Sequence, residues 1–150
     1  MSDYGRRLVI DADFETTVSA VCRAIRNENL QVLARTDVRE HFWRHLSHDF
    51  RQYVLVEAWS PDLALDALQH DLEVGVVFPT RFAVCELADG QTAVIATEPM
   101  GPFPDQEGWR EQAAALSATA DRERDRIARV LDRVTATLRE SARAAATPAA

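Results

Sequence analysis

One junction between a predicted strand and a predicted helix, which we call a joint, combines side chains that could bind a ligand. In the segment YVLVEAWSPDLALDAL, a strand-like run ends at Trp59 and Ser60, and a helical pattern begins at Pro61. An aromatic ring beside a hydroxyl group, next to a proline that fixes the local backbone, is suited to the rim of a pocket. Glu57, two residues before the tryptophan, adds a carboxylate to the same stretch.

A second joint of the same kind opens at Thr80 and Arg81, directly after a proline. A hydroxyl group and a guanidinium at this point favour a planar or anionic small molecule. The residues that we consider candidates for a ligand pocket are Glu57, Trp59, Ser60, Thr80 and Arg81. The alternative is that Trp59 fills core volume beside the next helix, as buried tryptophans more often do. In that case Arg81 pairs with Glu57 or Glu86.

Three histidines and an aspartate recur in the segment DVREHFWRHLSH. Asp37, His41, His45 and His48 are spaced by four, four and three residues, so on a helix they share one narrow sector. Imidazoles at such spacing can coordinate zinc, nickel or iron, or supply an axial haem ligand. The three histidines are therefore candidate metal ligands, and a transition metal or haem is the candidate cofactor.

The length of such a helix limits this metal site. From Asp37 to His48 the helix axis spans about 16 Å, so one ion reaches at most His41 with His45, or His45 with His48. The remaining ligands would come from another element or from a second subunit. The alternative interpretation is a polar helix flank, because the spacing lacks the specificity of known zinc signatures.

Composition bounds the classes of function. The chain has 150 residues and a formal net charge of −7, and its 17 basic residues are all arginines interleaved with acids, as in DRERDR. This pattern lacks the basic stripe of a nucleic-acid-binding protein, and lysine-dependent Schiff-base or P-loop chemistry is excluded.

No GxSxG, HExxH or Rossmann motif is present, so nothing in the sequence argues for an enzyme. No apolar run reaches the roughly 18 residues of a membrane helix, which predicts a cytoplasmic protein without a membrane or nucleic-acid partner.

The periodicity of apolar residues predicts the elements that hold these candidates. The strand-like runs are 6–12, 30–36, 52–58, 81–88 and 91–97. The helical patterns are 14–29, 38–48, 61–71 and a long one from about Trp109. We expect Asp13, Asp37 and Ser60 to cap three of these helices, and Asp89-Gly90 to form a hairpin turn. A five-stranded sheet with the long C-terminal helix on one face gives an α+β fold.

Three stretches in the middle of the chain, YVLVEAWSPDLALDAL, LEVGVVFPTRFAVCE and DGQTAVIATEP, resemble the domain of unknown function 302 family. The resemblance covers roughly residues 7 to 140. It implies a TATA-binding-protein-like, helix-grip fold, in which a curved, mainly antiparallel five-stranded sheet packs on helices and grips a long C-terminal helix. Members are typically small, soluble bacterial or archaeal proteins and often dimeric. No biochemical activity is settled for the family.

The chain departs from the family pattern at both joints. Where members commonly have Cys-Asn pairs, this chain has Trp59-Ser60 and Thr80-Arg81. Glu57 replaces a residue that is often small. Any metal or redox chemistry that other members perform with those thiols is therefore not open to this chain.

These features predict one α+β domain over residues 7–143, between an N-terminal extension at 1–6 and a disordered tail at 144–150. We expect a non-catalytic small-ligand-binding or accessory protein that forms a homodimer, with its pocket between the sheet and the C-terminal helix. Two alternatives remain: a metal- or haem-binding protein that uses the His-rich helix, or a structural homodimeric interaction module. Aromatic and Met residues are favoured at interface centres. The candidates of this kind are Met100, Phe103 and Trp109.

Overall fold

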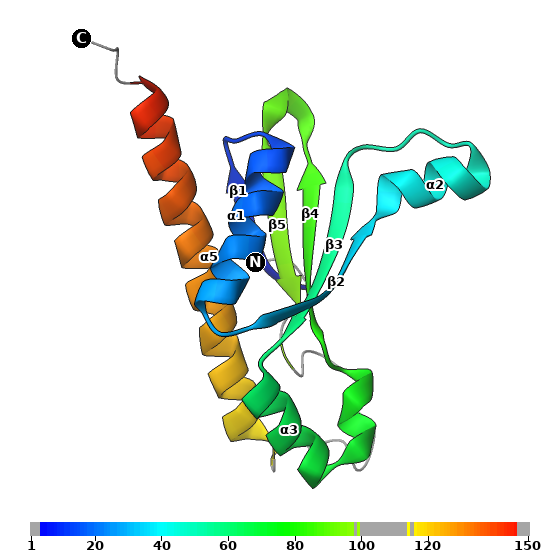
Figure 1. Ribbon diagram of the computed structural model, residues 1–150, viewed down its shortest axis with the longest axis vertical. Helices are drawn as coiled ribbons and strands as arrows, with labels where there is room; N and C mark the ends of the chain where they lie inside the picture. The colour runs from blue at the N-terminus through cyan, green and yellow to red at the C-terminus, as the bar shows by residue number, and fades with distance from the viewer. Residues whose placement is uncertain (1–3, 98, 100–113, 115, 147–150) are drawn as a thin grey trace.

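Five strands form a single sheet in the computed structural model, which describes residues 4–97, 99, 114 and 116–146. The strands are β1 (Gly5–Ile10), β2 (Gln31–Asp37), β3 (Tyr53–Trp59), β4 (Thr80–Glu86) and β5 (Thr92–Thr97). They lie in the order β1-β5-β4-β3-β2, and every neighbouring pair is antiparallel. The sheet is open, with β1 and β2 at its edges (Figure 1). The predicted α+β class with an antiparallel five-stranded sheet is confirmed.

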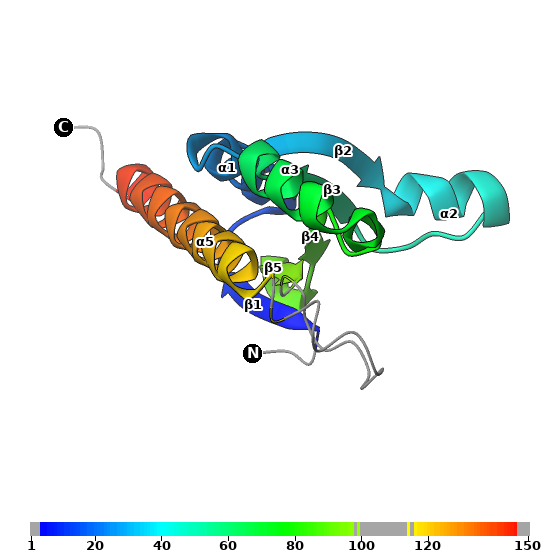
Figure 2. The same ribbon diagram turned by 90° about the horizontal axis from the view of Figure 1, so that it is seen from below.

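Two helices cover one face of this sheet. The helices are α1 (Phe14–Asn27), α2 (Val38–Leu46), α3 (Pro61–His70) and α5 (Ser117–Ala146). α1 and α5 pack against each other on one side of the sheet, whereas α2 projects on the other side (Figure 2). Within the described part of the chain, no helix is both long enough and apolar enough to cross a membrane.

Two of the three expected helix caps form as the sequence predicts. The side chain of Asp13 accepts a hydrogen bond of 2.9 Å from the amide of Thr16 at the start of α1. Asp37 accepts an equivalent bond of 2.9 Å from the amide of Glu40 at the start of α2. Ser60 occupies the N-cap position of α3, but its side chain makes no capping hydrogen bond. Its hydroxyl group instead donates a hydrogen bond to the side chain of Glu123 in α5.

Several element boundaries differ from those expected. α2 ends at Leu46 because Ser47 adopts a left-handed conformation with φ of 49°, so His48 lies outside the helix. The first strand begins at Gly5 rather than at residue 6, and α5 continues to Ala146. The expected start of the long helix at Trp109 lies outside the described residues, as do the candidate interface residues Met100 and Phe103.

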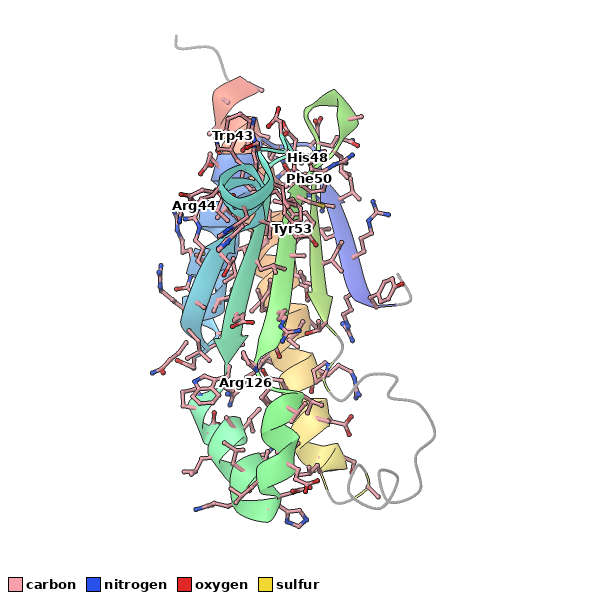
Figure 3. The ribbon with its side chains drawn as sticks, turned by 90° about the vertical axis from the view of Figure 1, so that its right-hand side faces the viewer. Trp43, Arg44, His48, Phe50, Tyr53 and Arg126 are labelled. Atoms are coloured by element: carbon pink, nitrogen blue, oxygen red, sulfur yellow. The ribbon has the colours of Figure 1, made fainter. Side chains whose placement is uncertain are left out.

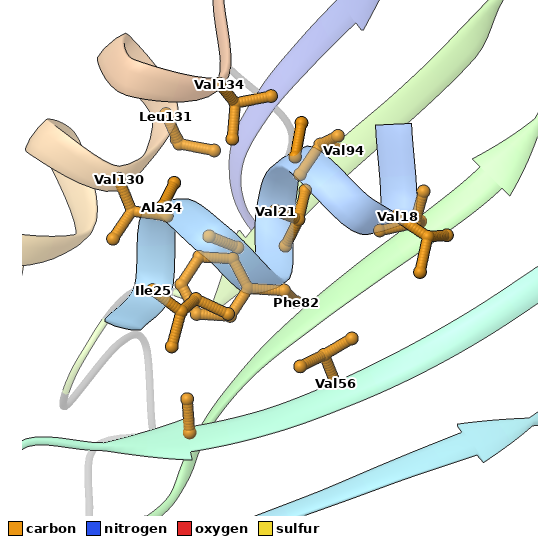
Figure 4. Close-up of a cluster of buried hydrophobic side chains, with 14 of the residues drawn as sticks. Val18, Val21, Ala24, Ile25, Val56, Phe82, Val94, Val130, Leu131 and Val134 are labelled. Carbon is orange, nitrogen blue, oxygen red and sulfur yellow. The ribbon is translucent and has the colours of Figure 1, made fainter. Parts of the chain in front are cut away.

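The main hydrophobic core lies between the sheet and the α1–α5 layer (Figure 4). Amphipathic spacing places one apolar stripe of each helix toward the sheet. The core is built from α1 residues such as Val21 and Ile25, strand residues such as Phe82, and α5 residues such as Val130 and Val134. All five of these side chains are fully buried. Most of the space between the sheet and α5 is therefore filled by α1 and by core side chains, and a hollow of about 360 Å³ remains between the edge strand β1 and α5.

Alternation along the strands gives the sheet two unlike faces. On β3, Val54 and Val56 are buried on the inner face, which is the face toward α1 and α5. Tyr53, Leu55 and Glu57 are only partly buried and point the other way. We call this second face, turned away from α1 and α5, the outer face. Figure 3 looks onto it and shows α2 in front of the sheet and α5 behind.

Candidate functional site

Ser60 and Thr80, one from each predicted joint, meet a carboxylate of α5. Ser60 Oγ lies 2.5 Å from Oε2 of Glu123, and Thr80 Oγ1 lies 3.2 Å from Oε1. The two joints are adjacent because β3 and β4 are neighbours, with Ala58 opposite Thr80. All three polar residues are buried. This cluster therefore fastens α5 to the ends of two strands.

Glu123 is the residue of this cluster that sequence reasoning missed. Burial raises the pKa of its carboxyl group, while the hydrogen bonds with Ser60 and Thr80 act in the opposite direction. The side chain has no exposed surface, and its hydrogen bonds with Ser60 and Thr80 fit a structural role. Glu123 lies in DRERDR, which the sequence analysis treated as solvated. The available signal was its spacing, three residues after Ala120 and four before Ile127, on the apolar stripe of α5.

A carboxylate–arginine pair lies beside this cluster and joins α3 to α5. The two terminal guanidinium nitrogens of Arg126, Nη1 and Nη2, donate hydrogen bonds to the carboxylate of Asp62, at 2.7 and 2.8 Å. The hydrogen bonds from Arg126 lower the pKa of Asp62 to about 2. The arginine is largely covered, whereas the aspartate is mostly exposed. Asp62 therefore stays ionised well into the acid range and is not a proton donor near neutral pH.

Glu57 and Arg81 lie on the outer face, away from Glu123. They are direct partners across β3 and β4, and Arg81 Nε lies 3.2 Å from Oε1 of Glu57. The ion pair that we considered as an alternative to a ligand contact is therefore present. Trp59 is partly buried, and its Nε1 is enclosed without a hydrogen-bond partner among the described residues. The five joint candidates thus divide between two faces of the sheet and do not line one pocket.

A hollow with a volume of about 390 Å³ lies on the outer face. It exists because Ala83, a small residue, stands between the larger side chains of Ile95 and Leu55, its partners on either side. Arg7 lies opposite Ile95 on the edge strand β1. The residues that line the hollow are Tyr4, Arg7, Tyr53, Leu55, Arg81, Ala83, Ile95 and Thr97. An apolar floor with an arginine at two points of its rim can receive a small anion that carries an apolar body.

The candidate metal ligands lie on and beside α2. The rings of His41 and His45 are stacked, with centroids 5.9 Å apart, and His48 follows the helix end. Among residues 4–97, 99, 114 and 116–146, no group of three or more His, Cys, Asp or Glu side chains is placed to hold a metal ion. A metal centre here would need ligands from the rest of the chain or from another molecule.

Comparison with known proteins places the chain in a family. The family model described as "Domain of unknown function DUF302" matches residues 7–134. The chain belongs to the DUF302 family. The crystal structure of an uncharacterised conserved DUF302 protein from Bacillus stearothermophilus is similar, with a TM-score of 0.74. That structure shares 22% sequence identity, and the match covers 89% of this chain and 99% of the Bacillus chain.

These comparisons establish the DUF302 fold and no specific function. At 22% identity the likeness to the Bacillus protein concerns the fold alone. No curated protein matches the chain. The function of this DUF302 protein must therefore be argued from its own residues.

Proposed function

We propose that this protein is a non-catalytic small-ligand-binding protein, and that its ligand is a small organic anion with a flat apolar body. The observation that carries the proposal is the outer-face hollow, in which Arg7 and Arg81 stand at the rim of an apolar floor. A pocket of about 300–1,000 Å³ with few polar groups is the usual form of a small-molecule site. The hollow, at about 390 Å³, suits a compact ligand such as an aromatic carboxylate.

The arginine charges at the rim of the hollow favour an anionic ligand. Among the described residues, Arg7 has no ion-pair partner, so its guanidinium is available to a ligand. Arg81 shares its charge with Glu57 through one bond of 3.2 Å, and it retains further donors. Ile95 offers apolar surface between the two arginines, because it lies on β5, the strand between β1 and β4. Tyr53 and Leu55 extend this apolar surface onto β3. A carboxylate at the rim and a ring on the floor would satisfy both kinds of surface.

The proposed location differs from the one expected for a helix-grip protein. We regard the packing of the sheet against the long α5 as a helix-grip arrangement, for which the sequence suggested a pocket between sheet and helix. In this chain that space holds the core side chains of α1, including Val21 and Ile25. A hollow of about 360 Å³ does lie between β1 and α5, but most of the residues that line it are charged or polar. We favour the outer-face hollow because its floor is apolar.

Binding of 2-naphthoate, followed by isothermal calorimetry, tests the proposal. We expect Arg7→Gln and Arg81→Gln each to weaken binding by about 10- to 100-fold, because a hydrogen bond to a charged group contributes about 1.5–3 kcal/mol. Ala83→Phe should abolish binding by filling the floor. Arg139→Gln is the matched control, since Arg139 is an exposed arginine of α5 far along the chain from the hollow, and it should leave binding unchanged.

Three outcomes would count against this assignment. One is that the native protein does not bind 2-naphthoate, and another is that Arg139→Gln weakens binding as much as Arg81→Gln. The third is that the uncharged analogue 2-naphthamide binds as tightly as the carboxylate, which would remove the role of the arginines.

A further inference from the structure

The edge strand β1 leaves one side of the sheet open along a regular strand. Its residues, Gly5–Ile10, pair with β5 in an unbroken register, and no other strand of the described residues lies beside it. Figure 3 shows β1 as the outermost strand on this side of the sheet. In an antiparallel pair, every second residue turns its backbone N–H and C=O groups away from the neighbouring strand. Within residues 7–10, β1 therefore offers backbone groups to a further strand.

The other edge strand, β2, is less suited to the addition of a strand. Its register with β3 shifts between Val32 and Ala34, and such irregularities turn an edge away from an incoming strand. α2 also follows directly after the last residue of β2, Asp37. The register of β1 shows no such shift, and α1 begins only at Phe14, after a short connection. Of the two edges, β1 is the one that an extended segment can pair with.

The hollow of about 360 Å³ between β1 and α5 lies at the margin of the sheet, because all of its lining residues belong to these two elements. Its apolar surface comes from Leu8, Ala128 and Leu131. Side chains of a strand point alternately to the two faces of its sheet. Every second side chain of a strand added beside β1 would therefore point to the side of α5, where this hollow gives an apolar side chain room.

Two adjacent arginines place positive charge on both faces of β1. Leu8 lines the hollow beside α5, so alternation places Arg6 on the same inner face and Arg7 on the outer face. Asp132 of α5 also lines the hollow and disfavours an acidic side chain there. On the outer face, the exposed Arg7 can pair with an acidic side chain of a neighbouring strand. The edge therefore fits a strand with acidic residues on its outer face and apolar residues on its inner face.

A second copy of β1 does not have this chemistry. Two β1 strands side by side would bring the arginines of both copies into one short ribbon, and like charges on neighbouring strands oppose pairing. The charges of the edge therefore select a different chain.

We propose that the open edge of β1 binds an extended segment of another protein, in which acidic and apolar residues alternate. The segment adds to the sheet beside β1, so that backbone hydrogen bonds supply affinity and the alternating side chains supply specificity. This inference goes beyond the proposed function, because the added strand lies outside β1 whereas the small ligand lies over Ala83 and Ile95.

Amide hydrogen exchange, measured by NMR, tests where a strand binds. The probe is a short synthetic peptide of alternating glutamate and valine with blocked ends. We expect it to slow exchange within residues 7–10 and to leave the other edge strand, residues 31–37, unchanged. The same peptide with every backbone nitrogen methylated is the matched control. It cannot donate backbone hydrogen bonds to β1, so it should give no protection.

A charge exchange tests the side chains of the contact. Arg7→Glu should weaken binding of the glutamate–valine peptide by roughly 2- to 30-fold, because a favourable cross-strand pair becomes an unfavourable one. The same variant should bind a peptide of alternating arginine and valine more tightly than the native protein does. Arg35→Glu makes the same change at an exposed position of β2 and should alter neither affinity. Ala83→Phe should lose 2-naphthoate and keep the peptide, so this proposal and the ligand proposal can fail separately.

A native protein that gains no protection at residues 7–10 from about 1 mM peptide, enough to detect a millimolar dissociation constant, would overturn the proposal. So would equal protection by the methylated peptide, or equal affinity of the native protein for the arginine–valine peptide. If exchange at residues 7–10 slowed with protein concentration in the absence of peptide, the edge would be pairing with a second copy of this chain. The assignment to another protein would then be wrong.

Discussion

At the scale of single residues, Glu123 has the environment with the largest consequences. Its carboxyl group is fully buried between the two joints, and burial raises its pKa above the ordinary 4.5. An acid whose pKa is raised in the folded state binds its proton more tightly there than in the unfolded chain. The free energy of unfolding therefore falls as pH rises from about 4.5 through the folded-state pKa.

Two substitutions separate the charge of Glu123 from its shape. Glu123→Gln keeps the volume and the hydrogen bonding and removes the ionisation, so the native protein should lose stability relative to this variant as pH rises above about 4.5. Glu123→Ala leaves a cavity and two unpaired hydroxyl groups, on Ser60 and Thr80, and should cost about 2–4 kcal/mol. Urea denaturation of both variants between pH 4 and 8 measures these effects. If the difference in free energy of unfolding between the native protein and Glu123→Gln stayed constant with pH, a raised pKa for Glu123 would be contradicted.

Asp62 should show the opposite dependence on pH. Its pKa is lowered to about 2 by Arg126, so its contribution is present above the unfolded value of about 3.8 and is lost as pH falls toward 2. We expect Asp62→Asn to be less stable than the native protein at pH 5 and equally stable near pH 2. Because the carboxylate is mostly exposed, water screens the pair and the effect is small. Thermal denaturation at a series of pH values between 2 and 5 measures it.

Part of the candidate site could have been located better from the sequence alone. Neighbouring residues of a strand point to opposite faces, so Thr80 and Arg81 could not both line one pocket. The same rule places Glu57 and Trp59 together on one face of β3. By contrast, the meeting of Ser60 with Glu123, 63 positions later, depends on how α5 lies against the strand ends, which local patterns do not determine.

At the scale of elements, α1 and α5 are joined by a charged contact at the end of α1. The nearly buried carboxylate of Glu28, the C-cap residue of α1, bonds to Arg129 at 2.7 Å and also to Arg133. The hydrogen bonds from Arg129 and then Arg133 lower the pKa of Glu28 below 4.5. Its stabilising contribution is therefore present above about pH 4.5 and is lost as pH falls through the folded-state value.

Glu28→Gln should destabilise the protein by about 1–2 kcal/mol at pH 7. The estimate is modest because the two arginine side chains are half-exposed and water screens them. Urea denaturation measures the loss, which should shrink below pH 4. Glu140→Gln, at an exposed position of α5, is the matched control and should have no measurable effect. An equal loss in both variants would show that overall charge, and not this contact, is responsible.

Most elements followed from local patterns, but their arrangement did not. Runs of apolar and strand-forming residues located all five strands, and Asp13 and Asp37 marked two helix starts. The left-handed Ser47, which ends α2 before His48, gave no advance signal, since serine is not the usual residue in that conformation. The strand order depends on pairing between distant segments, and no local signal encodes it.

At the scale of the whole molecule, Phe82 lies at the centre of the packing. It is fully buried on β4 and belongs to the core that unites the sheet with α1 and α5. Phe82→Ala should cost about 3–5 kcal/mol, from lost burial and the cavity left behind. Leu72→Ala, at an exposed site, should change stability by less than about 0.5 kcal/mol. Urea denaturation measures both, and a cost below about 1 kcal/mol for Phe82→Ala would contradict a single tightly packed core.

The position of β1 at the edge of the sheet has a consequence for synthesis. Among the described strands its neighbour is β5, where Gly5 pairs with Thr97 and Ile10 with Thr92, and α1 packs on α5, which comes later still. β1 and α1 therefore cannot form these contacts until nearly the whole domain has been translated. Such distant pairing slows folding, and a nascent chain in this state exposes an unpaired strand and an amphipathic helix, which are the surfaces that chaperones protect from aggregation.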